Sequence, residues 1–245
     1  MSLEDINLLL KKNNFDFHYL DVVNSTMSEI KYFNSENNIC LMANKQTNGV
    51  GRRGASWKSP KNNVYISILL KNILDIKNHF LNTAYTANII CDVLENICNV
   101  ETKIKWPNDI LIKDKKICGI ISEIYNINND VLVNTGFGVN IISSPKVENY
   151  KTTNVNENNK KIDNIKFVYK LMEKYLFYFD LLKGNSKSVI KQYKSRLKYL
   201  KTNIKLEFED SHIREGIFHD LNDDGSIIFE TNSSNENIYN ARIIK

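Results

Sequence analysis

Two segments of this chain carry apolar residues at the spacing of one helix face, and the segments between and after them are short runs typical of strands. This alternation constrains the fold more than any other feature of the sequence. The first segment, residues 80–98, predicts an amphipathic helix with an apolar face at Phe80, Ala84, Ala87, Cys91, Leu94 and Cys98. The second predicts a helix that ends near Gly184, with a face at Val168, Met172, Tyr175, Phe179 and Leu182.

The strand-like runs between the two helices contain apolar and β-branched residues bounded by turn residues. They are Val64–Leu70, Ile110–Ile112, Ile117–Ile124 and Val131–Val133. Strands clustered together with flanking helices predict an α+β fold built on a mixed or antiparallel sheet. Residues 143–164 are rich in Asn, Lys, Ser and Thr, and we expect them to form a connecting loop outside the core.

The chain changes character from Asn203 onward, where short strands follow one another with no helix pattern between them. The turn residues of 222–225 separate two of these strands. The four predicted strands are Ile204–Phe208, Ile213–Phe218, Ser226–Phe229 and Ile238–Ile244. We therefore divide the chain into a larger α+β domain over 1–198 and a small all-β domain over 199–245.

Composition narrows the classes of function. The formal charge of +5 is spread along the whole chain, which is weak evidence for nucleic-acid binding. The four cysteines form no C-x-x-C pair, so reduced core thiols are expected rather than disulfides or a zinc site. No apolar run approaches the ~18 residues of a membrane helix, and the amino terminus shows no secretory signal. These features predict a cytoplasmic protein without a membrane or nucleic-acid partner.

Rare residues gather in three stretches. Six of only nine glycines lie there, with both tryptophans, and Arg52 and Arg53 are two of only five arginines. In the first stretch, Gln46 to Trp57, alternating glycines allow close backbone approach to a ligand. Arginine beside them suits phosphate or carboxylate, and Trp57 offers a flat face to a purine. A flexible surface turn with a solvated arginine pair is the alternative.

The second stretch runs from Lys105 to Gly119. Asp109 is a reasonable ligand for nucleotide-bound Mg²⁺, and Lys116 could stabilise charge on a phosphoryl oxygen. The alternatives are ordinary turn chemistry and a solvated hairpin lysine. The third stretch, residues 134–141, could pass under a ligand with Asn140 reaching toward it. These residues by themselves predict an α+β domain that handles a nucleotide or an adenylate.

At these stretches the sequence resembles the biotin protein ligase family, of the monofunctional type that lacks an amino-terminal helix-turn-helix domain. The resemblance is carried by Ser25-Thr26, the Gly-Arg loop after Gln46, KWPND at residues 105–109, Lys116-x-x-Gly119 and the run 136–140. It implies a class II aminoacyl-tRNA synthetase-like catalytic domain and an SH3-like carboxy-terminal β-barrel. It also implies that ATP and biotin give biotinyl-5′-AMP, with Mg²⁺, and that a lysine of a biotin carboxyl carrier protein then takes the biotin.

The resemblance also implies roles for single residues. Arg52 and Lys116 would be catalytic, and Asp109 would lie at the metal. The expected biotin-binding residues are Ser25, Thr26, Gln46, Gly49, Val50, Gly51, Arg52, Lys116 and Gly119. The expected ATP- or adenylate-binding residues are Arg52, Arg53, Trp57, Asn108, Lys116 and Asn140.

Two positions depart from the family pattern. Val50 stands where the family loop has its first arginine, and Met27 stands where an asparagine usually follows Ser-Thr. The first departure bears on how the loop orders and on whether the protein is a monomer or a homodimer. Few residues precede Ser25, so no repressor role is expected. A lipoate or octanoate ligase and a non-catalytic biotin-binding protein are the competing interpretations; the chain has KWPND and lacks the R-R-x-x-G-G-G loop expected of the former.

Overall fold

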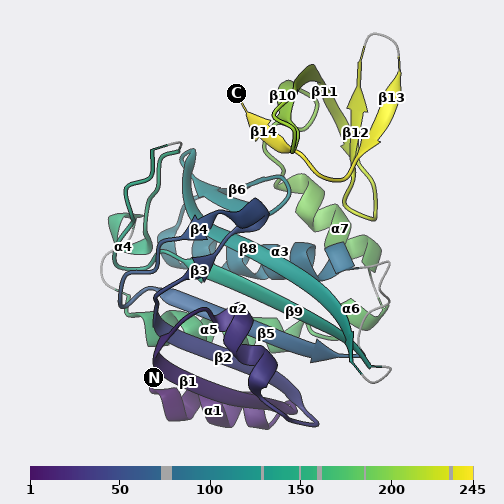
Figure 1. The fold of residues 1–245 in the computed structure, drawn as a ribbon. Helices are drawn as coiled ribbons and strands as arrows, with labels where there is room; N and C mark the ends of the chain where they lie inside the picture. The colour runs from purple at the N-terminus through teal and green to yellow at the C-terminus, as the bar shows by residue number, and fades with distance from the viewer. Residues whose placement is uncertain are drawn as a thin grey trace.

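A computed structural model of the chain describes residues 1–72, 79–127, 130–148, 150–158, 162–184, 186–231 and 234–244. Its centre is a seven-stranded sheet in the order β1-β2-β5-β9-β8-β7-β6, in which β1 pairs parallel to β2 and every other pair is antiparallel (Figure 1). The strands are β1 (Phe15–Val23), β2 (Asn38–Gln46), β5 (Val64–Lys71), β6 (Thr102–Lys105), β7 (Asp109–Ile112), β8 (Lys115–Ile127) and β9 (Asp130–Val139). This confirms the predicted α+β class.

Helices cover one face of this sheet. They are α1 (Leu3–Lys11), α3 (His79–Cys98), α5 (Asn164–Phe177) and α7 (Ser186–Ser195). The opposite face carries only short elements, which leave room for a cavity. These are α2 (Thr26–Glu29), η1 (Ile30–Tyr32), β3 (Gly49–Val50), η2 (Arg52–Gly54) and β4 (Ser56–Trp57). Central strands such as β5 are buried along nearly their whole length, which explains their continuous apolar sequence.

The first predicted helix is confirmed as α3, whereas the second is broken in two. The helix α5 ends at Phe177, and a separate short helix, α6 (Leu181–Gly184), follows it. The apolar spacing continues through the break because Tyr175 and Leu182 both bury into the same core. Gly184 therefore ends α6 and is not the cap of the longer helix.

The prediction that residues 143–164 lie outside the core is wrong for part of the segment. Residues 149 and 159–161 lie outside the described residues. Within the described part, Thr153, Asn154 and Val155 are buried, and Val155 begins the short helix α4 (Val155–Asn158). Backbone bonds from Lys116 to Lys151 and from Thr153 to Lys116 hold this segment against β8. The polar composition of this segment concealed its burial. Asn154 can be buried because its side-chain amide donates hydrogen bonds to Glu157 and Ser144 inside the protein.

The carboxy-terminal part is a five-stranded antiparallel sheet in the order β13-β12-β11-β10-β14, which confirms the predicted all-β unit. Its strands are β10 (Asn203–Glu207), β11 (Ile213–Leu221), β12 (Ile227–Glu230), β13 (Asn235–Ile238) and β14 (Arg242–Ile244). The single strand expected over 238–244 is instead the end of β13, a crossing at 239–241, and β14 at the opposite edge. The crossing is needed because β14 pairs with β10, and Ala241 in it is fully buried.

This sheet docks on the larger domain through the turn between β11 and β12. The Trp106 indole nitrogen donates a hydrogen bond of 2.8 Å to the Gly225 carbonyl. Gly225 has a φ of +86° and lies against the Phe80 ring, so any side chain at this position would both strain the turn and collide with the ring. Lys194 of α7 adds an ion pair of 3.2 Å with Asp220.

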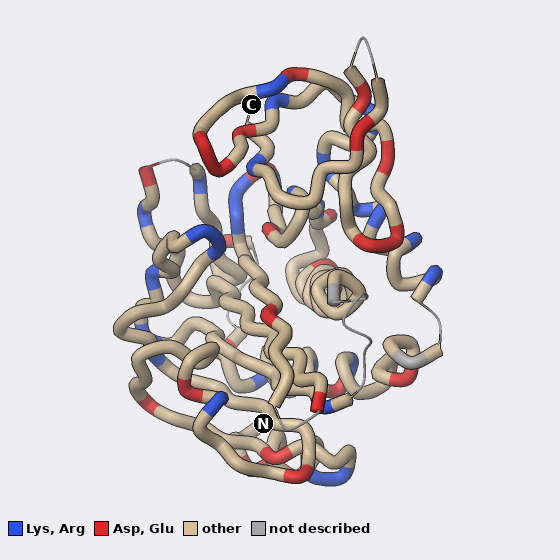
Figure 2. The backbone as a smooth tube through the Cα atoms, turned by 45° about the vertical axis from the view of Figure 1, so that its right-hand side comes forward, with Lys and Arg blue, Asp and Glu red and all other residues tan. Residues whose placement is uncertain are grey.

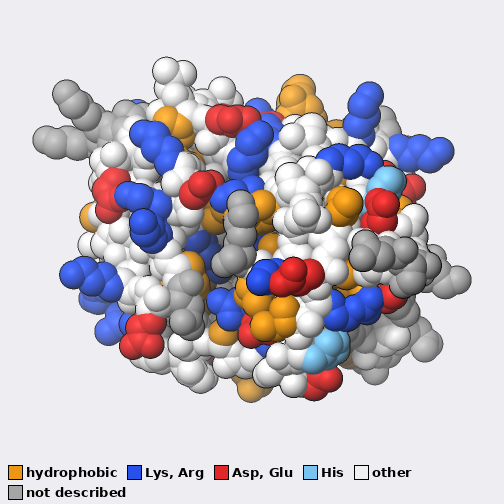
Figure 3. Space-filling view, turned by 90° about the horizontal axis from the view of Figure 1, so that it is seen from above, with side chains coloured by type: hydrophobic (Ala, Val, Ile, Leu, Met, Phe, Trp, Pro, Cys, Tyr) orange, Lys and Arg blue, Asp and Glu red, His pale blue; other side chains and the backbone are white. Residues whose placement is uncertain are grey.

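The cysteine and membrane predictions can also be compared with the structure. All four cysteines are free and buried, as expected of core thiols, and burial raises the pKa of Cys98 to about 11. Among the described residues no helix is long and apolar enough to cross a membrane. Lys and Arg are distributed over the whole chain (Figure 2), and on the face seen from above they are interspersed with Asp and Glu (Figure 3).

Candidate active site

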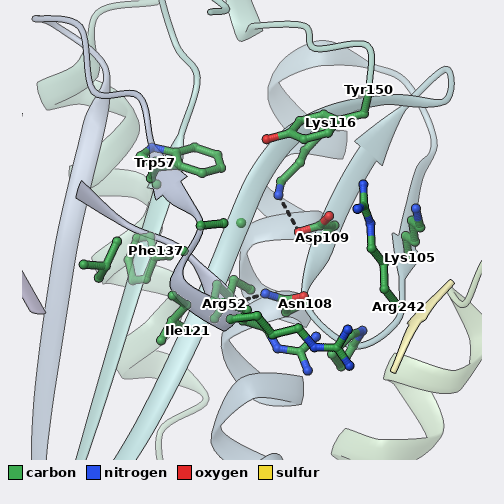
Figure 4. Close-up of a pocket in the computed structure, with 18 of the residues that line it drawn as sticks. Arg52, Trp57, Lys105, Asn108, Asp109, Lys116, Ile121, Phe137, Tyr150 and Arg242 are labelled. Carbon is green, nitrogen blue, oxygen red and sulfur yellow. Dashed lines mark hydrogen bonds and ion pairs between the residues drawn. The ribbon is translucent and has the colours of Figure 1, made fainter. Parts of the chain in front are cut away.

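A cavity of about 550 Å³ lies on the face of the sheet that carries the short elements. It collects most of the residues that the sequence singled out, from elements far apart in the chain (Figure 4). The predicted residues that line it are Ser25, Thr26, Gln46, Val50, Gly51, Arg52, Arg53, Trp57, Asn108, Asp109, Lys116 and Gly119. The three rare-residue stretches therefore form one site.

The inner end of the cavity is polar and largely satisfied. The Gln46 side-chain oxygen accepts from the Thr26 backbone N–H at 2.8 Å and from its hydroxyl at 3.1 Å, while its nitrogen donates to Ser59 at 2.9 Å. Ser67 donates to the Thr26 hydroxyl. The Ser25 hydroxyl is buried and has no partner in the protein. A buried unsatisfied hydroxyl costs free energy, so it is a candidate to bond a ligand.

Met27 lies beside this polar end and fills space that Gly136 leaves open. Any side chain at Gly136 would collide with the Met27 thioether, and the Met27 carbonyl accepts from Asn134 at 3.0 Å. Phe137 and Ile121 add apolar surface to the same part of the cavity. The inner end can thus take an apolar group with a small polar head.

Trp57 packs its indole ring on the sheet. A Cβ atom at Gly138 would lie 2.5 Å from the Trp57 indole nitrogen, and one at Gly119 would lie 3.0 Å from the ring. The two glycines therefore make the flat seat that the ring occupies. The indole nitrogen is buried without a partner, which leaves a donor for a ligand.

Lys116 and Asp109 form the charged centre of the site. Their ammonium and carboxylate groups are 2.7 Å apart and mostly buried, with side-chain exposures of 14% and 26%. The Lys116 ammonium also lies 5.2 Å from the Trp57 ring centroid and 5.0 Å from that of Tyr150. Such a desolvated cation between two aromatic faces can pass from its carboxylate to the oxygen of an anionic ligand.

The KWPND turn is held from several sides. The Asn108 amide donates to the Ile120 carbonyl at 2.6 Å, so this side chain shapes the turn besides lining the cavity. The Tyr193 hydroxyl of α7 donates to the Pro107 carbonyl at 2.7 Å. Lys105 is half-buried, and burial lowers the pKa of its ammonium.

Two predicted residues do not line the main cavity. Gly49 is buried behind it, where a Cβ would lie 2.6 Å from the Trp57 carbonyl, so it permits the close pairing of β3 with β4. Asn140 lines a small neighbouring cavity of about 70 Å³ with Trp57, Lys116 and Tyr150. Its amide nitrogen donates to the Thr153 carbonyl, and its oxygen has no partner.

Sequence reasoning missed several residues of the basic end. Lys105, Lys198 and Arg242 line the cavity there, and Tyr150 covers Lys116. Two of these residues carried a signal in the sequence: Lys105 belongs to the KWPND motif, and Arg242 is one of only five arginines. Tyr150 carried no signal because it lies in a segment that reads as a polar loop.

The site can bind an elongated ligand that is polar at one end, apolar in the middle and anionic at the other end. A mixed, mostly antiparallel sheet with helices on one face and this cavity on the other is the architecture of a class II aminoacyl-tRNA synthetase-like catalytic domain, to which a small antiparallel β domain is joined.

Comparisons with known proteins agree with this class. The sequence model of the biotin/lipoate A/B protein ligase family matches residues 19–140. The chain is 28% identical to the bifunctional ligase/repressor BirA of Bacillus subtilis over 249 residues, which covers 92% of this chain and 72% of the relative. It is 31% identical over 108 residues to a biotin–[acetyl-CoA-carboxylase] ligase of Paracoccus denitrificans, covering 43% of this chain and 45% of the relative.

The fold has a close counterpart among solved structures. The biotin protein ligase of Aquifex aeolicus in complex with biotin and ATP superposes with a TM-score of 0.79 at 24% identity, covering 93% of this chain and 97% of that one. The chain belongs to the biotin/lipoate A/B protein ligase family.

Proposed function

We propose that this protein activates biotin with ATP to give biotinyl-5′-AMP and pyrophosphate, and then transfers biotin to a lysine of a biotin carboxyl carrier protein, releasing AMP. One observation carries the proposal: a single cavity joins the polar end at Ser25 to the basic end at Lys116. A ligase of this kind must hold the acyl chain and the nucleotide in line, and the cavity spans both ends.

At the inner end we assign the biotin ring system. The free Ser25 hydroxyl supplies a bond to a polar ring head, and the Thr26–Gln46 pair fixes the wall beside it. Val50, Gly51 and Gly119 border the acyl chain, while Gly49 supports the loop from behind. The dithiolane of lipoate has no comparable polar head, so the buried Ser25 hydroxyl would stay unsatisfied with lipoate, which favours biotin.

At the other end we assign the adenylate. Arg52 and Arg53 reach its phosphate, Trp57 offers its ring to adenine, and Asn140 offers a free amide oxygen beside that ring. Lys116 contacts both the biotin carboxylate and the phosphoryl oxygens. Asn108 holds the turn that carries Asp109.

Magnesium enters this scheme with the nucleotide. Mg²⁺ prefers one or two carboxylates together with phosphate oxygens. Asp109 supplies one carboxylate at the cavity, and the described residues contain no group of three or more His, Cys, Asp or Glu side chains suited to hold a metal. Asp109 would be the protein contact of a cation brought by the triphosphate.

The protein's own contribution to the reaction is positioning and charge. ATP activates the carboxylate, so no nucleophile of the enzyme is needed, and effective molarity accounts for much of the acceleration. As negative charge develops on the phosphoryl oxygens, Lys116 shifts its ammonium toward them from Asp109. Arg52 keeps the mixed anhydride in place until the carrier lysine attacks.

The test is pyrophosphate release by the purified protein with MgATP and biotin, lipoate or octanoate, without any carrier. Biotin-dependent release that stops near one equivalent per enzyme is the expected result, because the adenylate stays bound. Release with lipoate instead of biotin would assign the chain to the other branch of the family. No release with any acid, together with measurable biotin binding, would leave a binding protein.

The remaining assignments rest on this function. We propose that the catalytic domain spans 1–198 and the β domain 199–245, because the chain enters the second sheet directly after Lys198 bonds back to Ile104. A cytoplasmic location follows from the need for ATP and for a carboxylase carrier domain. Sedimentation with and without biotin would decide between monomer and homodimer.

A further inference from the structure

The tip of the arginine loop, residues 51–55, contacts the carboxy-terminal domain at one side chain, that of Asn240. The Asn240 amide oxygen accepts from Arg52 Nη2 at 3.1 Å, from Arg53 Nη2 at 3.1 Å and from Arg53 Nε at 3.3 Å. Arg53 Nη1 also donates to the Glu207 carbonyl of β10 at 3.4 Å. Two guanidinium groups of the larger domain therefore converge on a single neutral acceptor of the smaller one.

The orientation of this amide is fixed by its other neighbour. The Asn240 amide nitrogen donates to Glu209 at 2.6 Å, so its oxygen must face the two arginines. Asn240 lies in the crossing between β13 and β14, and Ala241 next to it is fully buried. The acceptor is thus carried by a backbone that is anchored in the core of the sheet.

The loop tip has little internal support. It is held by the Gly51 N–H to the Ala55 carbonyl at 2.6 Å and by the Ala55 N–H to the Arg52 carbonyl at 3.1 Å. Arg53 has a φ of +54°, a left-handed conformation that a non-glycine residue adopts at a cost. Bonds from outside the loop must contribute to keeping it in this shape.

The charges at this contact are unbalanced. Among the described residues the hydrogen-bond acceptors of the two guanidiniums are the Asn240 oxygen and the Glu207 carbonyl, both neutral. Burial and the neighbouring Arg53 lower the pKa of Arg52, against a smaller opposite effect of Asp109. A neutral oxygen orders the two cations without neutralising them. An incoming phosphate can therefore accept hydrogen bonds from both guanidiniums without first breaking an ion pair.

We propose that Asn240 is a positioning residue: it holds Arg52 and Arg53 in place before the adenylate forms and releases them to its phosphate. We call these three residues the Asn240 latch. The inference rests on the proposed function only for the identity of the anion. The latch itself is a property of the free protein.

The first test uses an arginine-specific protease on the free protein, because the chain offers only five arginines to it. In Asn240→Ala the loop loses its acceptor, and cleavage after Arg52 or Arg53 should be about fivefold faster, as expected for a few exposed hydrogen bonds to charged groups. In Asn240→Asp the carboxylate pairs with both guanidiniums while the exposed Glu209 turns away, and cleavage should be slower than in wild type.

The matched control is Asn237→Ala. Asn237 is another exposed amide of the same sheet, and it accepts one hydrogen bond from Asn222 at 3.0 Å but does not touch the loop. Its cleavage should equal that of wild type. Faster cleavage after Arg196 or Arg214 in a variant would report general unfolding. The comparison would then be repeated at a lower temperature, at which circular dichroism shows the variant to be folded.

The second test measures escape of biotinyl-AMP from the enzyme. Asn240→Ala should release it several-fold faster than wild type, and Asn240→Asp should form it more slowly because its arginines stay paired. Equal cleavage rates in all four proteins would overturn the latch. Altered cleavage without any adenylate formation in wild type would support the latch and overturn the proposed function, so the two failures are distinguishable.

Discussion

Gln46 illustrates what a sequence motif can and cannot indicate about a single residue. The motif places it at the inner end of the cavity, where it lies, yet its oxygen and nitrogen already bond Thr26 and Ser59. The neighbouring Ser25 hydroxyl, equally polar in the sequence, has no partner. Which polar atoms remain free depends on tertiary geometry, and residue type does not reveal it.

The proposed role of Arg52 in retaining the adenylate can be tested by changing this one residue. Arg52→Gly should release biotinyl-AMP about 10- to 100-fold faster, because charge-assisted hydrogen bonds to a phosphate are worth about 1.5–3 kcal/mol. The measurement is biotin incorporation into a bystander protein such as serum albumin. Arg52→Lys, which keeps the charge, should leak less than the glycine variant. Bystander labelling at the wild-type rate would contradict the role assigned to Arg52.

At the scale of elements, hydrophobic spacing predicted where helices and strands pack but missed where they break. Both α5 and α6 bury residues in one core, so their shared periodicity concealed the break after Phe177. The crossing at 239–241 was read as strand for the same reason, since Ile238 and Ile243 are buried on either side of it and Ala241 is buried within it. Register and strand order depend on distant partners, such as β14 with β10, that a local pattern does not contain.

The glycines of β9 make room for the side chains that pack on this strand, and this can be tested at Gly138. Gly138→Ala should displace Trp57, because the added methyl would lie 2.5 Å from its indole nitrogen. We expect a loss of about 1–3 kcal/mol in the free energy of unfolding, typical of overpacking, and about a tenfold higher KM for ATP. Gly184→Ala is the control, since no atom lies within 4 Å of the added methyl. Urea unfolding and pyrophosphate exchange measure the two effects; an unchanged KM would separate Trp57 from nucleotide binding.

At the scale of the whole molecule, a charged cluster ties α3 to the segment that leads into the second sheet. Glu95 accepts from the Thr102 hydroxyl at 2.6 Å and from Arg196 at 3.0 Å, and Arg196 also pairs with Asp92. Burial by itself would raise the pKa of Glu95, but the hydrogen bonds from Thr102 and Arg196 outweigh it, so the pKa lies below its ordinary 4.5.

The sign of the pH dependence follows from this shift. A carboxyl with a lowered pKa stabilises the fold fully above pH 4.5 and loses that contribution as the pH falls through its folded-state value. Glu95→Gln should therefore lower the free energy of unfolding at pH 7 by about 1–2 kcal/mol, with a smaller difference from wild type near pH 3. Urea titrations at both pH values measure it. Glu101→Gln, at a mostly exposed pair with Lys103, should have little effect at either pH.

The cavity is lined by residues from Ser25 at one extreme of the chain to Ala241, Arg242 and Ile243 at the other. A growing polypeptide cannot complete this site until residue 243 has been added. A chain broken off earlier would lack part of the lining and would gain less of the stabilisation that bound ligand gives a folded protein, which at a ligand concentration of 100 times the Kd is about 2.7 kcal/mol. In a cell that contains biotin and ATP, such fragments would be selectively exposed to proteases while finished molecules are protected.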